Sequence, residues 1–427
     1  MTVGLDARLA SIEDVAERQL CAGCGACAVA QPGTIRMVDD LTTGRRPLVA
    51  AGASTQQALE ACPGVRLEHD RAAWDEGWDA ELADEWGPVL AVWEGYATDP
   101  EIRFRGSSGG AATALALWSL ERSSAGSVVH SGARPGAPEF NDAVQSRDRD
   151  QLLAHTGSRY APASPCEGLA TASGPLAFVG KPCDVAGARM LDERGLLPEG
   201  AEVDLTVAIF CAGAPSTAAT LGYLADTWGQ EPGALDELRF RGHGWPGSFV
   251  ARAQDGSTHE ASYAASWGVI QAGRPWRCRI CPDHTGEFAD VSVGDPWHTP
   301  PQPGEHGRSL VVARTARGLG AVERAIEDGY LELERVDASL LPASQAELQR
   351  TRRTVQGRLL AMRLAGLPVP RFRGMALLGT WLRTPPGNLL RSVLGTLRRL
   401  GRYGLRRRRP VVEFEPSRRA PTAGGGS

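Results

Sequence analysis

The sequence predicts an α/β protein that has a cysteine-rich unit at its N-terminus and a basic helical tail at its C-terminus. Apolar runs of strand length alternate with helix-like segments from about residue 88 to residue 336, which is typical of a sheet covered by helices. Three regularly spaced cysteines precede this alternation, at 21–27. Residues 351–412 contain fifteen arginines and no acidic residue, which leaves 31 basic and 50 acidic residues elsewhere. An acidic body therefore carries a basic tail.

The run Cys21-Ala-Gly-Cys24-Gly-Ala-Cys27 has the spacing with which bacterial ferredoxins hold a 4Fe–4S cluster. Gln31 occupies the position of the fourth cysteine, and a later cysteine, in Cys62-Pro63, lacks the usual trio before it. Since the fourth cysteine of each such run binds the other cluster, these two losses remove one cluster together. The ligands left for a single cluster are Cys21, Cys24, Cys27 and Cys62. A zinc knuckle and a chance group of thiols are the alternatives.

A Gly/Ser loop at Ser107, Ser108, Gly109 and Gly110 opens into a helix that begins near Ala111. Residues 66–87 before it are expected to be a helical connector, 88–96 a strand and 97–101 a turn. Free backbone N–H groups and the helix dipole suit a phosphate at such a point, here the pyrophosphate of a flavin nucleotide. The alternative is a helix cap with a close packing contact.

Strands are predicted at 127–133, 175–180 and 202–210, with helices after 181 and over 216–228. Shorter strands are expected at 238–242, 248–253, 259–263, 288–295, 310–314 and 330–336, with a helix at 318–327. Cys183 and Cys211 each follow a strand, at the sheet edge where ligands gather in α/β folds.

A C-x2-C pair, Cys278 and Cys281, completes a second set of four with Cys183 and Cys211. We expect a second 4Fe–4S cluster there, with buried structural thiols or a redox-active pair as the alternatives. Cys166 has no partner pattern and is expected to be structural.

Five motifs occur in order: LCAGCGAC at 20–27, CPG at 62–64, SSGGAATAL at 107–115, FVGKPCDVAG at 178–187 and CRICPDHTGEFADVSVGD at 278–295. Together they resemble the coenzyme F-420 hydrogenase/dehydrogenase beta-subunit family from about residue 17 to residue 340. The resemblance implies an oxidoreductase with FAD and 4Fe–4S clusters that passes electrons between a hydride carrier, of the deazaflavin F-420 type or similar, and one-electron carriers.

The residues expected at the FAD are Ser107, Ser108, Gly109, Gly110, Thr113, Ser158 and Tyr160. Lys181 is the only lysine beside 45 arginines. We expect it to be catalytic, lying where flavin and cluster approach each other and stabilising the anionic reduced flavin. The alternative is a coincidence of composition.

The leading hypothesis for function is a flavin-dependent reductase with its own substrate pocket. An electron-transfer subunit that feeds a separate catalytic partner and a non-enzymatic iron–sulfur sensor are the alternatives. The electron donor would be a deazaflavin, a ferredoxin or a nicotinamide. Reduced thiols, with neither an export signal nor a membrane span in the sequence, indicate the cytoplasm.

The basic tail would either dock on the acidic body or touch the inner face of a membrane through apolar-basic helices. Nucleic-acid binding is not expected, because no recognition fold accompanies the arginines. The sequence divides into a ferredoxin-like iron–sulfur unit (1–65), a flavin-loop domain (66–170), a domain with the second cysteine set (171–342) and the tail (343–427), whose residues 422–427 are expected to be disordered.

Overall fold

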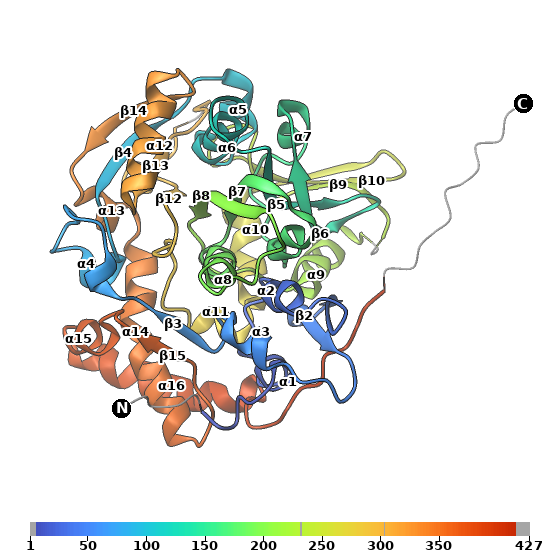
Figure 1. The fold of residues 1–427 in the computed structure, drawn as a ribbon. Coiled ribbons are helices and arrows are strands. Elements are labelled where there is room, and N and C mark those ends of the chain that lie inside the picture. Colours follow the sequence, from blue (N-terminus) through green and yellow to red (C-terminus); the bar gives the residue numbers. More distant parts are fainter. Residues whose placement is uncertain (1–5, 231–232, 303, 416–427) are drawn as a thin grey trace, which may run out of the picture.

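A mixed eight-stranded sheet forms the centre of the protein in a computed structural model that describes residues 6–230, 233–302 and 304–415 (Figure 1). Its strand order is β14 (Leu331–Val336), β4 (Ala91–Ala97), β13 (Ser309–Ala313), β12 (Val291–Gly294), β8 (Ala201–Ile209), β7 (Gly174–Gly180), β5 (Ser127–Arg134) and β6 (Ala137–Ser146). The four strands β12, β8, β7 and β5 are parallel, and antiparallel strands flank them. The predicted α/β fold class is confirmed.

Helices cover both faces of this sheet, and β7 shows how its side chains divide between them. Ala177 packs in one core with α6 (Ala111–Arg122) and α12 (Ala316–Glu327). Its neighbours Leu176 and Phe178 point into the opposite core, which contains α8 (Pro182–Asp192). Because a strand buried on both faces needs apolar residues at every position, the continuous apolar run that predicted β7 is explained.

The N-terminal unit consists of short elements around the cysteine loop: α1 (Ile12–Glu17), α2 (Ala26–Ala30), the antiparallel hairpin β1 (Ile35–Asp40) and β2 (Gly44–Val49), and α3 (Gln56–Glu60). Helix α2 contacts α8 of the central domain. Strand β3 (Arg66–Glu68) follows and pairs in parallel with β15 (Arg371–Arg373) of the tail.

The prediction of a helical connector at 66–87 is wrong for most of its length. Only the 3-10 turn η1 (Arg71–Ala73) and α4 (Ala83–Trp86) are helical after β3. Gly77 and Gly87 have positive φ angles, 87° and 69°, which interrupt a helix. The expected turn at 97–101 is also wrong in part, because Asp99 caps α5 (Pro100–Arg105).

A smaller antiparallel sheet, in the order β11 (Thr258–Ser262), β10 (Ser248–Ala253) and β9 (Leu235–Arg239), packs with α9 (Thr217–Trp228) and α10 (Tyr263–Ile270). Its three strands were predicted within a few residues, but α10 was not predicted. The other short helices of the body are α7 (Arg149–Leu153), η2 (Pro165–Thr171), η3 (Gln271–Gly273) and α11 (Trp276–Arg279).

The tail forms α13 (Leu340–Ser344), α14 (Ala346–Leu364), α15 (Leu377–Leu382) and α16 (Pro386–Arg402), and it lies beside the N-terminal unit (Figure 1). Val355, Leu359 and Leu400 share the core of α1 and the cysteine loop. Arg408 forms ion pairs with Asp14 at 2.8 Å and Glu17 at 2.5 Å. The described tail therefore docks on the body, as one of the two alternatives expected. Residues 422–427 lie outside the described residues.

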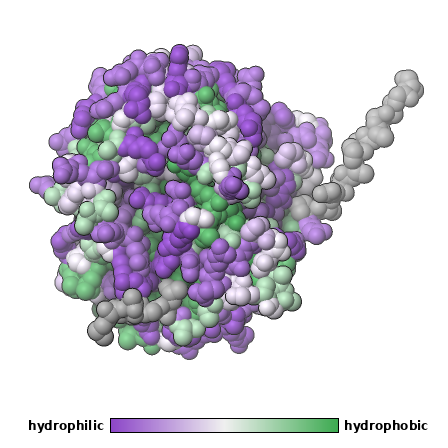
Figure 2. Space-filling model, viewed as in Figure 1, coloured by the Kyte–Doolittle hydropathy of each residue, from purple (hydrophilic) through white to green (hydrophobic). Residues whose placement is uncertain are grey.

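Five leucines on α15 and α16 remain exposed: Leu378, Leu382, Leu390, Leu394 and Leu397. The face drawn in Figure 2 is largely hydrophilic, with separate apolar patches. Within the described residues, no helix combines the length and the apolar character that crossing a bilayer would require.

Candidate functional site

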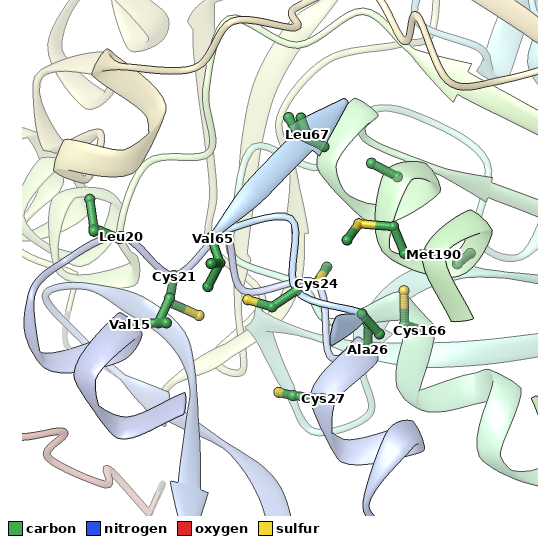
Figure 3. Packing of buried hydrophobic residues seen from close by; sticks show 14 of the residues in the cluster. Val15, Leu20, Cys21, Cys24, Ala26, Cys27, Val65, Leu67, Cys166 and Met190 are labelled. Atoms are coloured by element: carbon green, nitrogen blue, oxygen red, sulfur yellow. The ribbon is translucent and has the colours of Figure 1, made fainter. Parts of the chain in front are cut away.

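The N-terminal cysteine set, Cys21, Cys24, Cys27 and Cys62, lines one small cavity. All four thiols are buried, and Figure 3 shows the side chains of Cys21, Cys24 and Cys27 turned toward a common space. Gly25 begins α2 with a φ of 89°, a conformation that lets the loop turn sharply between two of the cysteines. Gly64 lies so close that a Cβ there would be 3.3 Å from the Cys62 sulfur. The fold thus gathers the four cysteines that the sequence grouped.

The chemistry of this set is that of thiolates that need a cation. Burial raises the pKa of Cys21, Cys27 and Cys62, and the other three thiols raise the pKa of Cys27 further. Thiols whose ionisation is opposed in this way fit a cationic iron–sulfur core, which supplies the missing positive charge. Among the described residues, no three His, Cys, Asp or Glu side chains are arranged to hold a single metal ion.

Gln31, which stands where a ferredoxin has its fourth cysteine, has a structural role. Its amide donates to the carbonyl of Ser54 at 2.8 Å and accepts from the N–H of Ala58 at 2.9 Å. Helix α3 has no side-chain cap of its own, so Gln31 satisfies an N–H in its first turn and ties α2 to α3.

Cys166 is fully buried beside this set, near Cys24 (Figure 3). Its thiol lies 3.3 Å from the carbonyl oxygen of Asp184 in α8. A hydrogen bond from Cys166 is the main reason that the pKa of Cys24 is lowered. Gly187 in α8 allows this approach, since a Cβ there would be 3.1 Å from the Cys24 sulfur.

The core cysteine set, Cys183, Cys211, Cys278 and Cys281, comes from the first turn of α8, the end of β8 and the segment that includes α11. Burial raises the pKa of Cys211 to about 12 and that of Cys281 to about 11. The charges of Cys211 and Cys281 raise the pKa of Cys183, and those of Cys278 and Cys281 raise the pKa of Cys211. Electrostatic interactions therefore connect all four thiols. The N–H of Gly213 donates to the Cys211 sulfur at 3.3 Å.

A central cavity of about 520 Å³ lies against this core cysteine set. Cys211 is part of its wall. The wall also contains seven of the residues predicted at the flavin or as catalytic: Ser107, Ser108, Gly110, Thr113, Ser158, Tyr160 and Lys181. Gly109 is not on the wall, because it packs on β13: a Cβ there would lie 2.8 Å from the backbone of Arg308. The predicted residues thus converge, apart from Gly109, whose role is close packing.

The Gly/Ser loop presents an uncapped helix start to the cavity. Gly110, the N-cap of α6, has a φ of 77° and no capping side chain, and the Ser309 hydroxyl accepts the Ala111 N–H at 3.4 Å. The Ser107 hydroxyl accepts the N–H of Ser158 at 2.7 Å, which joins the two predicted loops. Free N–H groups at the start of a twelve-residue helix are suited to an anionic group. Both features weighed from the sequence, the open helix start and the close packing contact, are present.

Aromatic side chains form another part of the wall, and the sequence patterns singled out only one of them, Tyr160. They are Tyr160, Tyr263, Trp267 and Trp297. The rings of Tyr263 and Trp297 are stacked with centroids 6.1 Å apart, and those of Tyr160 and Trp267 are 4.9 Å apart. The i, i+4 spacing of Tyr263 and Trp267, after the N-cap Ser262, was the available signal for α10 and for this wall.

A buried ion pair, Arg241–Asp295, supports the aromatic wall. The two side chains meet at 2.7 Å, and the guanidinium also donates to the Tyr160 hydroxyl at 3.2 Å and lies 4.8 Å from the ring centroid of Tyr263. Burial opposes the charge of Arg241, but Asp295 outweighs it and raises the pKa of the arginine. A second Arg241 N–H donates to the carbonyl of Ser107, so one side chain connects the Gly/Ser loop, the aromatic wall and Asp295.

Lys181 lies between the central cavity and the core cysteine set. Its ammonium contacts the Asp184 carboxylate at 2.6 Å, and its side chain is one fifth exposed. Burial opposes the charge, but Asp184 and then the thiol of Cys183 raise the pKa of Lys181, so the ammonium stays protonated. The predicted position of Lys181 beside Cys183 and the cavity agrees with this geometry; its catalytic role stays a prediction.

His130 and His155 also border the cavity and were not singled out from the sequence. Burial lowers the pKa of His130 to about 4, and its Nε2 lies 2.8 Å from the Ser146 hydroxyl. Burial lowers the pKa of His155 as well. Both rings are therefore neutral near pH 7, and the positive charges that lower the pKa values in the core cysteine set are those of Lys181, at Cys183 and Cys211, and of Arg277, at Cys281.

Comparison with known proteins links most of the central domain to one family. A family model described as "Coenzyme F420 hydrogenase/dehydrogenase, beta subunit N-term" matches residues 92–170. The companion model, which describes the C terminus of the same coenzyme F420 hydrogenase/dehydrogenase beta subunit, matches residues 174–339. The cysteine-rich unit and the whole tail lie outside these matches.

Two curated relatives carry the name coenzyme F420 hydrogenase subunit beta. The protein from Methanothermobacter thermautotrophicus is 24% identical over 295 residues, which cover 66% of this chain and 99% of the relative. The protein from Methanosarcina barkeri is 24% identical over 287 residues, covering 64% and 93%. A chain from the xenon-derivatised F420-reducing NiFe hydrogenase complex of Methanosarcina barkeri has a similar fold, with a TM-score of 0.52, 21% identity, and coverage of 67% of this chain and 97% of that one.

Proposed function

The chain belongs to the coenzyme F420 hydrogenase/dehydrogenase beta-subunit family, and we propose that it is an iron–sulfur flavoprotein that moves electrons between a hydride carrier, FAD and 4Fe–4S clusters to reduce a substrate. The observation that carries this proposal is the contact between the central cavity and the core cysteine set at Lys181 and Cys211. A flavin supplies the exchange between hydride and single electrons, and clusters carry the single electrons onward.

Each part of the cavity has a role in this proposal. The start of α6, with the Ser107 and Ser108 hydroxyls, would bind the FAD pyrophosphate. The aromatic wall would cover the planar ring system and exclude water, held in place by Arg241. The Lys181 ammonium would hold a positive charge beside the ring, where the reduced flavin is anionic. The two cysteine sets would bind the clusters.

The FAD and iron contents of the purified protein test this proposal. Protein purified without oxygen should contain one FAD and about eight irons per chain, as two 4Fe–4S clusters require. The double variant Cys278→Ser/Cys281→Ser should lose about half of the iron while the N-terminal set keeps its own. A chain that purifies without flavin, or whose iron is unchanged in that variant, contradicts the assignment. Iron without flavin would favour the iron–sulfur sensor.

An electron-transfer subunit is the second candidate, and the names of the relatives favour it, because both are subunits of a hydrogenase. In that case a redox partner protein, and not a pocket in this chain, would complete the reaction. Single-turnover experiments with reduced deazaflavin, ferredoxin or nicotinamide decide which donor reduces the bound flavin. Steady-state turnover of the isolated chain with a substrate favours the reductase, while reduction without turnover favours the subunit.

The exposed leucines of α16 support a further proposal, contact with a membrane surface. Leu390, Leu394 and Leu397 form a stripe at helical spacing, with Arg391 and Arg398 beside it. Replacing the three leucines with serine should reduce co-sedimentation with anionic vesicles, while the fold stays intact because these side chains face solvent. Equal sedimentation of the variant and the natural protein would contradict this contact.

A further inference from the structure

A second large cavity lies within the tail, outside the region that matches the family. It has a volume of about 610 Å³ and is bounded by α14, the turn before α16 and α16 itself. Five arginines line it: Arg350, Arg353, Arg358, Arg391 and Arg399. The other lining residues are mainly threonines, a serine and amides, and no acidic residue is among them. We call this site the arginine cavity; it shares only Ala346 with the wall of the central cavity.

Two of the five arginines are already neutralised by carboxylates. Arg353 binds the Glu85 carboxylate with two nitrogens, at 2.6 and 2.9 Å. Arg350 pairs with Glu347, and both side chains are more than two thirds exposed. These pairs leave the other three lining arginines as the source of unbalanced charge.

Those three have no carboxylate partner among the described residues. Arg358 donates to the backbone carbonyl of Arg279, and Arg391 donates to the amide oxygen of Asn388. The Arg399 side chain makes no hydrogen bond or ion pair within the described part of the chain. Guanidinium groups whose hydrogen-bond acceptors are neutral keep their full positive charge. Positive charges gathered in a concave site favour the binding of an anion.

The surroundings of Arg358 increase this imbalance. Burial, and then the charges of Arg399, Arg279 and Arg274, lower the pKa of Arg358 to about 10. The hydrogen bonds of Arg274 and Arg279 go to carbonyl and amide oxygens. A partly buried guanidinium among three others is unfavourable unless a negative group compensates it.

The start of α16 adds an independent observation. Thr384, Pro385 and Asn388 line the cavity at the first turn of this seventeen-residue helix, and no side chain caps it. Pro386 has no N–H and the Asn388 N–H donates to the Pro385 carbonyl at 2.8 Å, so the dipole of this helix start is what favours an anion where the arginines gather.

We propose that the arginine cavity binds a phosphate-bearing ligand. Guanidinium forks bind phosphate oxygens in pairs, and the neighbouring hydroxyl and amide side chains can donate further hydrogen bonds. The volume exceeds what one inorganic phosphate fills, so the ligand carries at least a diphosphate or a phosphate with an organic group. The phosphate can belong to a soluble molecule or to a lipid headgroup, since exposed leucines of α16 lie on the same helix.

Titration calorimetry of the full cofactor-loaded chain with inorganic pyrophosphate tests this proposal. We expect saturable binding at one site per chain. Arg399→Gln should weaken it about tenfold or more, because hydrogen bonds between charged groups are worth at least that factor. Arg358→Met should also weaken pyrophosphate binding. If Arg358→Met does not fold, Arg399→Gln still tests the proposal, because the exposed Arg399 can be replaced without disturbing the core. Arg398→Gln is the matched control, since it removes the same charge from the adjacent position on α16 but does not line the cavity.

Vesicles of phosphatidylcholine with phosphatidic acid separate the two sources of phosphate. Vesicle binding that requires Arg399 but not Arg398 assigns the phosphate to a lipid, and pyrophosphate binding without vesicle binding assigns it to a soluble ligand. Equal weakening by the Arg398 and Arg399 variants would mean general attraction to the basic tail and would overturn the proposal. The proposal would also be overturned if neither pyrophosphate nor the vesicles bound. A shifted cluster potential in Arg358→Met would then show that the arginines serve as counter-charge to the nearby thiolates.

Discussion

Replacing Arg352 with methionine should destabilise the protein strongly and loosen the loop behind the core cysteine set. Arg352 lies on α14 of the tail and is 4% exposed, and its partner Glu287 is 1% exposed. Its guanidinium also donates to the carbonyls of Pro282, next to Cys281, and of Met375. One side chain therefore joins the tail, the cysteine loop and a buried carboxylate.

The expected loss follows from leaving Glu287 buried with less compensation. Removing one partner of a buried ion pair typically costs about 3–5 kcal/mol, because the remaining charge has lost its counter-charge. His69, 3.1 Å from Glu287, moderates this cost. With an unfolding entropy of about 2 cal/mol/K per residue, the loss corresponds to a fall in Tm of about 3–6 °C for a chain of 427 residues.

The pH dependence gives a second signature. Burial opposes ionisation of Glu287, but Arg352 and His69 outweigh it and lower the pKa of this carboxyl. A lowered carboxyl pKa stabilises the fold above the unfolded value of about 4.3 and loses that contribution as the pH falls through the folded value. The difference between the natural protein and Arg352→Met should therefore be largest near neutral pH and shrink below about pH 4.

Calorimetric unfolding at pH 7, together with iron quantitation, measures both effects. Arg350→Met is the control, because Arg350 and Glu347 form an exposed pair two residues away on the same helix, which is worth less than about 1 kcal/mol. Equal Tm values and equal iron contents for the two variants would refute the reasoning, since Arg352 would then not hold the cysteine loop.

Four further changes test the site. Cys62→Ser should lose about four irons per chain and one EPR signal of the reduced protein, and unchanged iron would exclude Cys62 as a ligand. Ser108→Asp should abolish FAD retention, measured by absorbance, because a carboxylate repels the pyrophosphate; full FAD content would refute the placement. Lys181→Met should make the flavin midpoint potential more negative in potentiometric titration, and an unchanged potential with unchanged turnover would make Lys181 incidental. His130→Asn should flatten the loss of stability between pH 6.5 and about 4 by up to about 1.4 kcal/mol per pH unit, because the buried neutral ring takes up a proton on unfolding; identical slopes in denaturant titrations would contradict that.

The local patterns of the sequence were sufficient for the sheet and for the cysteine sets. The apolar run of β7 and the Lys-Pro start of α8 are local signals, and the structure follows them. The prediction of a helical connector at 66–87 was wrong because it rested on composition, the Asp, Glu and Trp residues, and not on a helical periodicity. Glycines at 77 and 87 with positive φ angles interrupt any helix there.

Apart from Tyr160, the aromatic wall was missed because its connections are long-range. Arg241 meets Asp295 across 54 positions, and nothing in either local segment identifies the other. The arginine cavity shows the same limit: the sequence shows a basic tail, but only the packing of α14 against α16 separates its paired arginines from the unpaired ones.

The shared core of the N-terminal unit and the tail has a consequence for how the protein matures. Leu359, Met362 and Leu400 belong to the same buried core as Cys21, Cys24 and Cys27, and β15 pairs with β3. During synthesis these cysteines leave the ribosome before the tail helices that share their core. The cysteine loop is therefore made before α14 and α16 can pack against the N-terminal unit, and docking of the tail completes the core that buries its thiols.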